Sequence, residues 1–377
     1  MAARIEPGSV AALVEAVCEI VGASDGRLFV ADYGLQRLQQ LDSDGLAGES
    51  QPIEGTIAGR AFASGEIVGS GDRQALLWVP LTDGAERLGV LELAFASGDV
   101  PARELLDPVI AVLVLLLIAR RRYSDVWSRT RRAEAMSAAA EAQWSLLPPL
   151  ACTTRRVAVG AILEPAYEIG GDSFDYALND DRLDFSIVDA IGHGMTAVLM
   201  SSAAINSLRN DRRAGRDLTA AYQHADRLII DHFGNSFYVT AQIGTLDLTT
   251  GILTWLNAGH VRPMLVRNGT FAGELQCQPS MPIGLDGPVV DIATESLQRG
   301  DRVLFYTDGI IESKAPDGTY FGADRLADFL VRATLDQVPV AETVRRLAAA
   351  VVNHVGQGLN DDATLLLIEY RGSTDQP

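Results

Sequence analysis

The sequence predicts an α+β protein with two domains, the larger of which is a sandwich of β-sheets flanked by helices. Three observations favour this class. The chain has 377 residues, more than a single hydrophobic core usually serves. Its apolar content of 47% and charged content of 21% are those of a folded globular protein. In the C-terminal part, β-rich runs alternate with helical runs and outnumber them.

Charge and cysteine usage exclude several classes of function. The formal net charge of −18 speaks against nucleic-acid binding, which needs a basic footprint. Cys18, Cys152 and Cys277 lie far apart and form no Cys-x-x-Cys pair, so neither a disulfide framework nor a zinc site is expected. The N-terminus lacks the basic-then-apolar pattern of a signal peptide. We therefore expect a cytoplasmic protein with free thiols.

The first predicted domain covers 1–120 and alternates short helices with strands. A helix over Val10–Val21 comes first. Two strands, a glycine-bounded helix, a β-hairpin and an apolar helix follow, over 27–31, 37–41, 55–65, 75–95 and 109–119. The apolar run 109–119 has 11 residues, whereas crossing a bilayer takes about 20. We expect it in the core or in a dimer interface, and we expect no membrane contact.

This order of elements, with the segments GTIAGRAFASGEIV and LWVPLTDGAERLGVLEL, resembles a GAF sensory domain. The resemblance covers roughly residues 8–120. It implies a domain that binds a small ligand, a chromophore or nothing. No cysteine lies where we expect a chromophore to attach. A ligand-free dimerisation or docking domain is the alternative.

Residues 121–147 are predicted to form a linker helix ahead of a second domain over 148–372. The stretch from Tyr123 to Leu147 contains no glycine or proline, and Pro148-Pro149 ends it. Its loose three-to-four spacing of small and apolar residues would let the helix pair with its copy in a homodimer. A plain surface helix is the alternative.

The second domain is predicted from seven β-rich runs and four helical runs. The β-rich runs cover 157–163, 183–188, 239–247, 252–257, 264–267, 302–306 and 363–370, and the helical runs cover 196–209, 218–233, 323–334 and 340–356. Many of the strands are candidates for antiparallel pairing, so a sheet sandwich flanked by helices is expected.

Acidic residues stand at four strand ends or loops of this domain, beside glycine or other small residues. They are Asp172, Asp189, Asp308 and the pair Asp361-Asp362. Aspartate is short, so the backbone fixes where its carboxylate lies. Ligand sets made only of oxygen select Mg²⁺ or Mn²⁺ over zinc or copper. Each aspartate alone is typical of a turn or cap, but the four positions together predict a metal centre able to activate water at a phosphoryl group.

Six segments occur here in an order that resembles the SpoIIE-type branch of the metal-dependent protein phosphatases (PPM, type 2C-like). They are EPAYEIGGDSFDY, VDAIGHGMTAVLM, LNAGHVRPMLVR, MPIGL, VLFYTDGIIESKAPDGTYFG and NDDATLLLIEY, and the resemblance covers about 148–371. It implies an α-β-β-α sandwich with two Mn²⁺ or Mg²⁺ ions, in which metal-activated water hydrolyses phosphoserine or phosphothreonine on a protein. The family's usual substrate, a phosphorylated anti-sigma-factor antagonist, is the implied partner.

Carried over position by position, the resemblance implies the ligands of the two metals. Asp189 bridges both ions, and the Ala190 carbonyl is a further ligand. Asp308 and Asp361 hold the second side of the centre. Asp172 completes the site, directly or through water.

The roles of other residues in these segments are less fully specified by the resemblance. Asp362 is expected to orient its neighbour rather than to bind metal. His193 is the candidate general acid for the leaving serine oxygen, and a histidine hydrogen-bonded within its loop is the alternative. His260 is expected to fix its loop. Arg262 either meets a phosphate or is simply exposed. Where the family often has serine this chain has Ile191, which removes no ligand.

Two functions from other classes compete with the phosphatase. A catalytically silent, phosphatase-like scaffold is disfavoured because every metal aspartate is present. A phosphodiesterase or nucleotide hydrolase is disfavoured by the missing Walker-type loop and His/Asp clusters. For the phosphatase, a helix over 195–209 directly follows Asp189, so the first domain and the linker would regulate the enzyme by moving that ligand.

Overall fold

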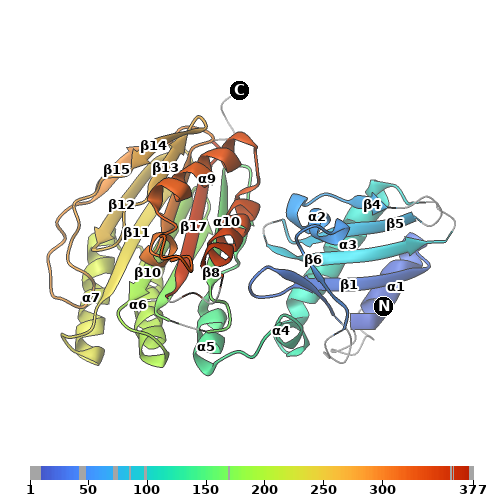
Figure 1. Cartoon of the computed structure of the whole chain (residues 1–377), viewed down its shortest axis with the longest axis horizontal. Coiled ribbons are helices and arrows are strands. Elements are labelled where there is room, and N and C mark those ends of the chain that lie inside the picture. Colours follow the sequence, from blue (N-terminus) through green and yellow to red (C-terminus); the bar gives the residue numbers. More distant parts are fainter. Residues whose placement is uncertain are drawn as a thin grey trace. The chain divides into compact units, whose positions relative to one another are not determined.

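The computed structural model describes residues 10–41, 48–70, 75–84, 86–96, 100–168, 170–356, 359 and 361–372. The chain divides into two compact units, Met1–Ala135 and Met136–Pro377. Unit 1 contains one six-stranded sheet, and unit 2 contains a five-stranded and a six-stranded sheet (Figure 1).

Unit 1 is an antiparallel sheet with helices on both faces. The strand order is β3-β2-β1-β6-β5-β4, with β1 (Asp25–Ala31), β2 (Arg37–Gln40), β3 (Ser50–Pro52), β4 (Val68–Ser70), β5 (Ala75–Thr82) and β6 (Arg87–Phe95). Alternate residues of β5, among them Leu77 and Val79, join the core beneath α1 (Val10–Val21) and α3 (Arg103–Arg120). The opposite face carries α2 (Ile57–Ser64), which Thr56 caps and Gly65 ends at a φ of 69°. Within the described part of the chain, no helix is long and apolar enough to cross a membrane.

The continuous linker helix predicted over 121–147 is wrong. The chain instead forms α4 (Val126–Thr130) and α5 (Ala138–Leu146), and the described residues 131–137 between them are not helical. Side-chain contacts explain the interruption. The Arg131 guanidinium lies 4.3 Å from the centre of the Tyr33 ring in unit 1, and Ser137 caps α5 by accepting from the Ala140 N–H. These contacts override a sequence that has no helix-breaking residue, and the border between the units falls inside the predicted linker.

Unit 2 is a four-layer α-β-β-α sandwich, as predicted. One sheet has the order β15-β12-β11-β10-β9 and the other β14-β13-β16-β17-β8-β7. The strands are β7 (Ala151–Thr153), β8 (Val157–Glu164), β9 (Asp172–Asn179), β10 (Arg182–Ala190), β11 (Val239–Asp247), β12 (Ile252–Ala258), β13 (Met264–Arg267), β14 (Thr270–Glu274), β15 (Ala293–Ser296), β16 (Arg302–Tyr306) and β17 (Ala363–Tyr370). Helices α6 (Met195–Arg213) and α7 (Leu218–Phe233) cover the first sheet, and α9 (Ala323–Leu335) and α10 (Val340–Val355) cover the second (Figure 1).

The core of unit 2 lies between the two sheets and beneath the helices. The rings of Phe185 in β10 and Phe305 in β16 meet across the sandwich at a centroid distance of 4.6 Å. Every residue of β8 is buried, because the other sheet covers one face of this strand and α10 covers the other. Gly160 permits that close packing, since a Cβ there would lie 3.0 Å from the Cα of Ala341.

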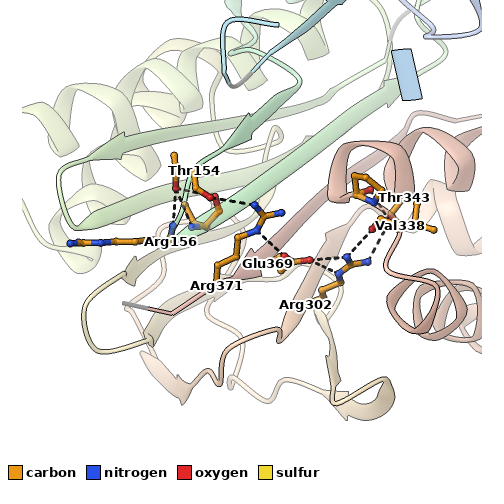
Figure 2. A network of polar contacts seen from close by, with 9 residues as sticks. Thr154, Arg156, Arg302, Val338, Thr343, Glu369 and Arg371 are labelled. Carbon is orange, nitrogen blue, oxygen red and sulfur yellow. Dashed lines mark hydrogen bonds and ion pairs between the residues drawn. The ribbon is translucent and has the colours of Figure 1, made fainter. Parts of the chain in front are cut away.

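A polar network fixes the six-stranded sheet to the turn between α9 and α10 (Figure 2). Glu369 of β17 accepts from Nε of Arg302 at 2.8 Å and from Nε of Arg371 at 2.9 Å. The buried Arg302 also donates to the Val338 carbonyl oxygen at 2.8 Å, and Arg371 donates to the Thr154 carbonyl oxygen at 3.3 Å. Because Arg302 begins β16 and Glu369 is the last residue but one of β17, the network secures the end of these strands opposite to the aspartates.

Candidate metal centre

The predicted aspartates meet at one end of the sandwich, and both sheets contribute. From the five-stranded sheet come Asp172, at the start of β9, and Asp189 and Ala190, at the end of β10. Asp172 and Asp189 are paired in the antiparallel register of these strands. From the six-stranded sheet come Asp308, at the start of the short helix α8 (Asp308–Ile311) after β16, and Asp361 and Asp362, just before β17.

Asp172 is held by hydrogen bonds from the opposite sheet. Its Oδ2 accepts from the hydroxyl of Thr307 at 2.7 Å, and that hydroxyl accepts from the Thr364 N–H at 3.0 Å. On the other side, the side-chain amide of Gln143 in α5 donates to the Asp172 carbonyl oxygen. All four residues are buried, so the Asp172 carboxylate is fixed in place.

Asp362 fixes the backbone that carries Asp172. Its Oδ1 accepts from the Gly170 N–H at 2.9 Å and its Oδ2 from the Asp172 N–H at 3.1 Å. Both carboxylate oxygens thus contact backbone groups, as expected of an orienting residue. Two glycines permit this packing: a Cβ at Gly170 would lie 2.4 Å from the Asp362 carboxylate, and one at Gly309 would lie 1.8 Å from the Asp362 carbonyl oxygen.

The carboxylates raise one another's pKa values. Burial raises the pKa of Asp172 well above its ordinary value, and the charges of Asp189 and Asp362 add to the effect. The pKa of Asp189 is raised to about 7 by burial and by the charges of Asp308 and Asp361. Burial also raises the pKa of Asp362 to about 6 and that of Asp308 above its ordinary value. The site therefore concentrates negative charge that a bound cation would neutralise.

The donor set fits a hard divalent cation. Among the residues that the structure describes, no three His, Cys, Asp or Glu side chains form a ready-made metal cage. Mg²⁺ seldom uses such a cage, because it binds through one or two carboxylates and keeps several waters. Asp189, Asp308 and Asp361 offer carboxylate oxygens of this kind at the edge of the buried site.

The two histidines of the predicted segments occupy different environments. His193 is exposed in the loop between β10 and α6, so its role as general acid stays a prediction. His260 is buried, and burial lowers its pKa to about 4, so it is neutral. Its ring is hydrogen-bonded with the Thr240 hydroxyl at 2.7 Å and with the Tyr306 carbonyl oxygen at 3.1 Å. His260 therefore fixes its loop, as predicted.

Arg262, the candidate phosphate contact, is exposed. Its guanidinium lies 3.9 Å from the Glu274 carboxylate, and its side chain is 49% exposed. Sequence analysis missed two residues that support the site, Thr307 and Gln143. Thr307 had a local signal, since a hydroxyl follows a buried strand and directly precedes Asp308. Gln143 had none, because its partner is a backbone carbonyl 29 residues away.

Comparison with known proteins places this geometry in a family. Residues 179–371, 193 of the 377, match the family described as Stage II sporulation protein E (SpoIIE). The chain is similar to protein IcfG of Synechocystis sp., with 21% identity over 242 residues that cover 56% of this chain and 38% of that protein. It is also similar to phosphoserine phosphatase RsbU of Bacillus subtilis, with 21% identity over 246 residues that cover 62% of this chain and 69% of that protein.

A solved structure shares the fold. The RsbU and RsbW domains of Rv1364c from Mycobacterium tuberculosis align with a TM-score of 0.50 at 28% identity, over 60% of this chain and 64% of that chain. The chain thus spans between 38% and 69% of the length of these three proteins. The family match includes Asp189, Asp308, Asp361 and Asp362, whereas Asp172 lies just before it. On the evidence of its fold, its aspartates and this match, the chain belongs to the SpoIIE family.

Proposed function

We propose that this chain is a protein serine/threonine phosphatase that depends on Mn²⁺ or Mg²⁺ and hydrolyses phosphoserine on a partner protein in bacterial signalling. One observation carries the proposal: Asp172, Asp189, Asp308 and Asp361 converge at the end of a SpoIIE-family sandwich, and burial raises the pKa values of the first three. The similarity to RsbU, which is named a phosphoserine phosphatase, supports the reaction class.

Each residue of the centre has a distinct task in this proposal. Two cations would be held by Asp189, the Ala190 carbonyl, Asp308 and Asp361. Asp172 would complete the site directly or through water. When bound, the cations supply Lewis acidity to the phosphoryl oxygens and lower the pKa of coordinated water. Asp362 keeps the backbone of Asp172 in position through its two N–H contacts. His193 is the candidate proton donor to the leaving oxygen.

A pocket beside Asp361 is the proposed entrance for the phosphorylated side chain. It has a volume of about 200 Å³ and is lined by Gly309, Glu312, Ser313, Lys314, Tyr320, Val355 and Asp361. Lys314, whose ammonium lies 4.8 Å from the centre of the Tyr320 ring, brings a positive charge to this acidic surrounding. That charge suits a phosphate group. The proposed substrate class is an anti-sigma-factor antagonist.

The regulatory part of the proposal concerns unit 1 and α5. Residues 1–120 would be a GAF-like domain, 121–147 a linker and 148–372 the phosphatase domain, and the chain would be a homodimer. A pocket of about 490 Å³ at α1 and β1, whose lining includes Val14 and Leu28, offers space for a small ligand of unit 1. In unit 2, α5 contacts the site through Gln143, and its Leu146 carbonyl oxygen accepts from Arg209 of α6 at 2.7 Å. A shift of α5 would therefore reach the strand of Asp172 and the helix after Asp189.

Phosphate release from p-nitrophenyl phosphate tests the proposal. The assay compares four proteins with and without Mn²⁺: the unchanged chain, Asp189→Asn, Asp308→Asn and the control Asp231→Asn. The control changes an exposed carboxylate of α7. We expect manganese-dependent turnover in the chain and the control, and a loss of at least about 100-fold in the two site variants. Calorimetry measures manganese binding in parallel. A chain that binds Mn²⁺ but turns over neither this substrate nor a phosphoserine protein is a catalytically silent scaffold.

A further inference from the structure

Three exposed apolar side chains follow the metal ligands of β10 along the chain. They are Ile191, Met195 and Leu199, which we call the α6 patch, and their exposed fractions are 40%, 44% and 52%. Ile191 comes directly after Ala190, the last residue of β10, and Met195 is the first residue of α6. Met195 and Leu199 stand four positions apart, so they lie side by side on one face of the helix. Apolar side chains left open to water beside a reaction site indicate a surface that another molecule covers.

The loop between β10 and α6 keeps the α6 patch close to the metal centre. Gly192 and Gly194 have φ angles of 91° and 74°, which let the chain turn sharply from the strand into the helix. The Ile191 N–H donates to the Tyr238 carbonyl oxygen at 3.1 Å, so the loop stays joined to the residue before β11. The patch therefore continues the surface at which a phosphorylated side chain has to bind in order to reach Asp189.

The exposed side of α6 changes from apolar to polar with distance from the metal centre. Beyond the α6 patch, the exposed positions of the helix are Asn206, Asn210 and Arg213. A second copy of α6, or another long helix packed against it, would need an apolar face along the whole length of the helix. The restriction of apolar side chains to the first turns instead favours a partner that binds at the metal centre. In a phosphatase this partner is the phosphorylated substrate.

The α6 patch lies in an uncharged segment of a strongly acidic chain. From Ala190 to Leu208 the sequence contains no Asp, Glu, Lys or Arg, although the formal net charge of the chain is −18. A phosphorylated protein brings further negative charge, which the chain as a whole repels. Apolar contact with the residues around the phosphoserine adds binding energy without adding to that repulsion. The charged interaction is then left to the phosphate and the cations.

We propose that the α6 patch binds apolar side chains that flank the phosphoserine of the protein substrate. The inference rests on the proposed phosphatase function and adds to it the chemistry of the substrate sequence. Three residues of extended chain reach at most about 10 Å from the phosphoserine, whereas the step from Met195 to Leu199 is about 6 Å along the helix. Side chains of the size of leucine close to the phosphoserine can therefore cover both residues while the phosphoryl group lies at the metal centre.

Hydrolysis of two synthetic phosphopeptides in the presence of Mn²⁺ tests this contact. One peptide carries two leucines on each side of a single phosphoserine, and the other carries glutamine at those positions within the same polar sequence. The enzymes are the unchanged chain, Met195→Gln/Leu199→Gln and the control Leu335→Gln, which changes a leucine at the end of α9 that is 63% exposed. Glutamine is as good a helix former as leucine or methionine, so the substitutions remove apolar surface and keep the helix.

The deciding quantity is the ratio of the kcat/KM values for the leucine and glutamine peptides, because a general loss of activity lowers both values alike. We expect a ratio of at least about ten for the unchanged chain and the control, and a ratio close to one for the double variant. Equal values for the two peptides in the unchanged chain overturn the inference, as does a double variant that keeps the full ratio.

Turnover of p-nitrophenyl phosphate, which has no flanking residues, reports on the phosphatase itself. Its absence in the presence of Mn²⁺ would refute the proposed function, whereas its presence together with equal values for the two peptides refutes this inference alone.

Sedimentation velocity of the same three proteins distinguishes the substrate from a second copy of the chain as the molecule that covers the α6 patch. We expect the double variant to sediment as the unchanged chain does at every concentration. A dimer that dissociates in the double variant but not in the control would assign the patch to a second copy and overturn the inference.

Discussion

Replacing Asp189 by asparagine should stabilise the metal-free protein while destroying its metal centre. In the folded chain the Asp189 carboxyl has a pKa of about 7, because it is largely buried and faces the charges of Asp308 and Asp361. At pH 8 without a cation, folding therefore places the charged Asp189 carboxylate in a buried site beside other negative charges, which costs free energy. Asparagine has nearly the same shape and no charge, so it removes this repulsion.

The sign and size of the effect follow from proton linkage. The pKa of Asp189 rises from an ordinary 3.8 to about 7 on folding. Between these two pH values the folded state therefore keeps a proton that the unfolded chain has lost. Its contribution to stability is fully present below pH 3.8 and is lost as the pH rises through 7. The full difference corresponds to about 4 kcal/mol, and partial solvent screening reduces it to about 2 kcal/mol. For a unit of this size, 2 kcal/mol shifts the melting temperature by about 4–8 °C.

Scanning calorimetry of the full chain measures this shift. In EDTA at pH 8, the transition of unit 2 should occur about 4–8 °C higher in Asp189→Asn than in the unchanged chain. At pH 5 the two should melt closer together, because the carboxyl is then protonated in the folded state. Mn²⁺ should raise the transition of the unchanged chain but not that of Asp189→Asn, which also identifies this transition as the one of unit 2.

The exposed Asp231→Asn should follow the unchanged chain under every condition. The charge argument is refuted if Asp189→Asn, at pH 8 in EDTA, has a melting temperature equal to or below that of the unchanged chain. If Mn²⁺ leaves the unchanged chain where it was, the metal centre itself is refuted.

Three other substitutions test the support of the site. Thr307→Val should lower the free energy of unfolding, measured in urea, by about 1–3 kcal/mol, because the buried Asp172 carboxylate loses its hydrogen-bond donor. Thr307→Ser keeps a hydroxyl and should restore that stability. Equal stability of the unchanged chain and both variants would contradict this hydrogen bond's role. Gly309→Ala places a Cβ 1.8 Å from the Asp362 carbonyl oxygen, so calorimetry should show Mn²⁺ binding weakened at least about tenfold, and an unchanged affinity would disprove the packing. Asp175→Asn breaks a buried ion pair with Arg209, at 2.7 Å, and should destabilise unit 2 by about 3–5 kcal/mol in urea, whereas a neutral effect would show that the pair adds nothing.

The elements that sequence analysis predicted well are those whose pattern is set by burial alone. The strands Val239–Asp247 and Ala363–Tyr370 and the helix Leu218–Phe233 have the predicted bounds, because their apolar periodicity reports the core directly. Strand β9 was missed, since aspartate is depleted in strands and the segment contains both Asp172 and Asp175. Specific partners compensate for those charges: Thr307 donates to Asp172, and Arg209 donates to Asp175.

The candidate site likewise contains residues that the sequence could predict and residues that it could not. Its aspartates were predictable, because each one stands in a short segment whose glycines and strand ends are visible along the chain. Their supports were not, because the Thr307–Asp172 contact spans 135 residues and the Asp362–Asp172 contact spans 190. Each supporting residue satisfies an atom whose position only the closed sandwich defines. The same reason explains the linker, where Arg131 finds the Tyr33 ring across the fold and a locally favoured helix is interrupted. A motif therefore identifies the groups able to bind a cation, while the pairing of the two sheets determines how firmly those groups are held.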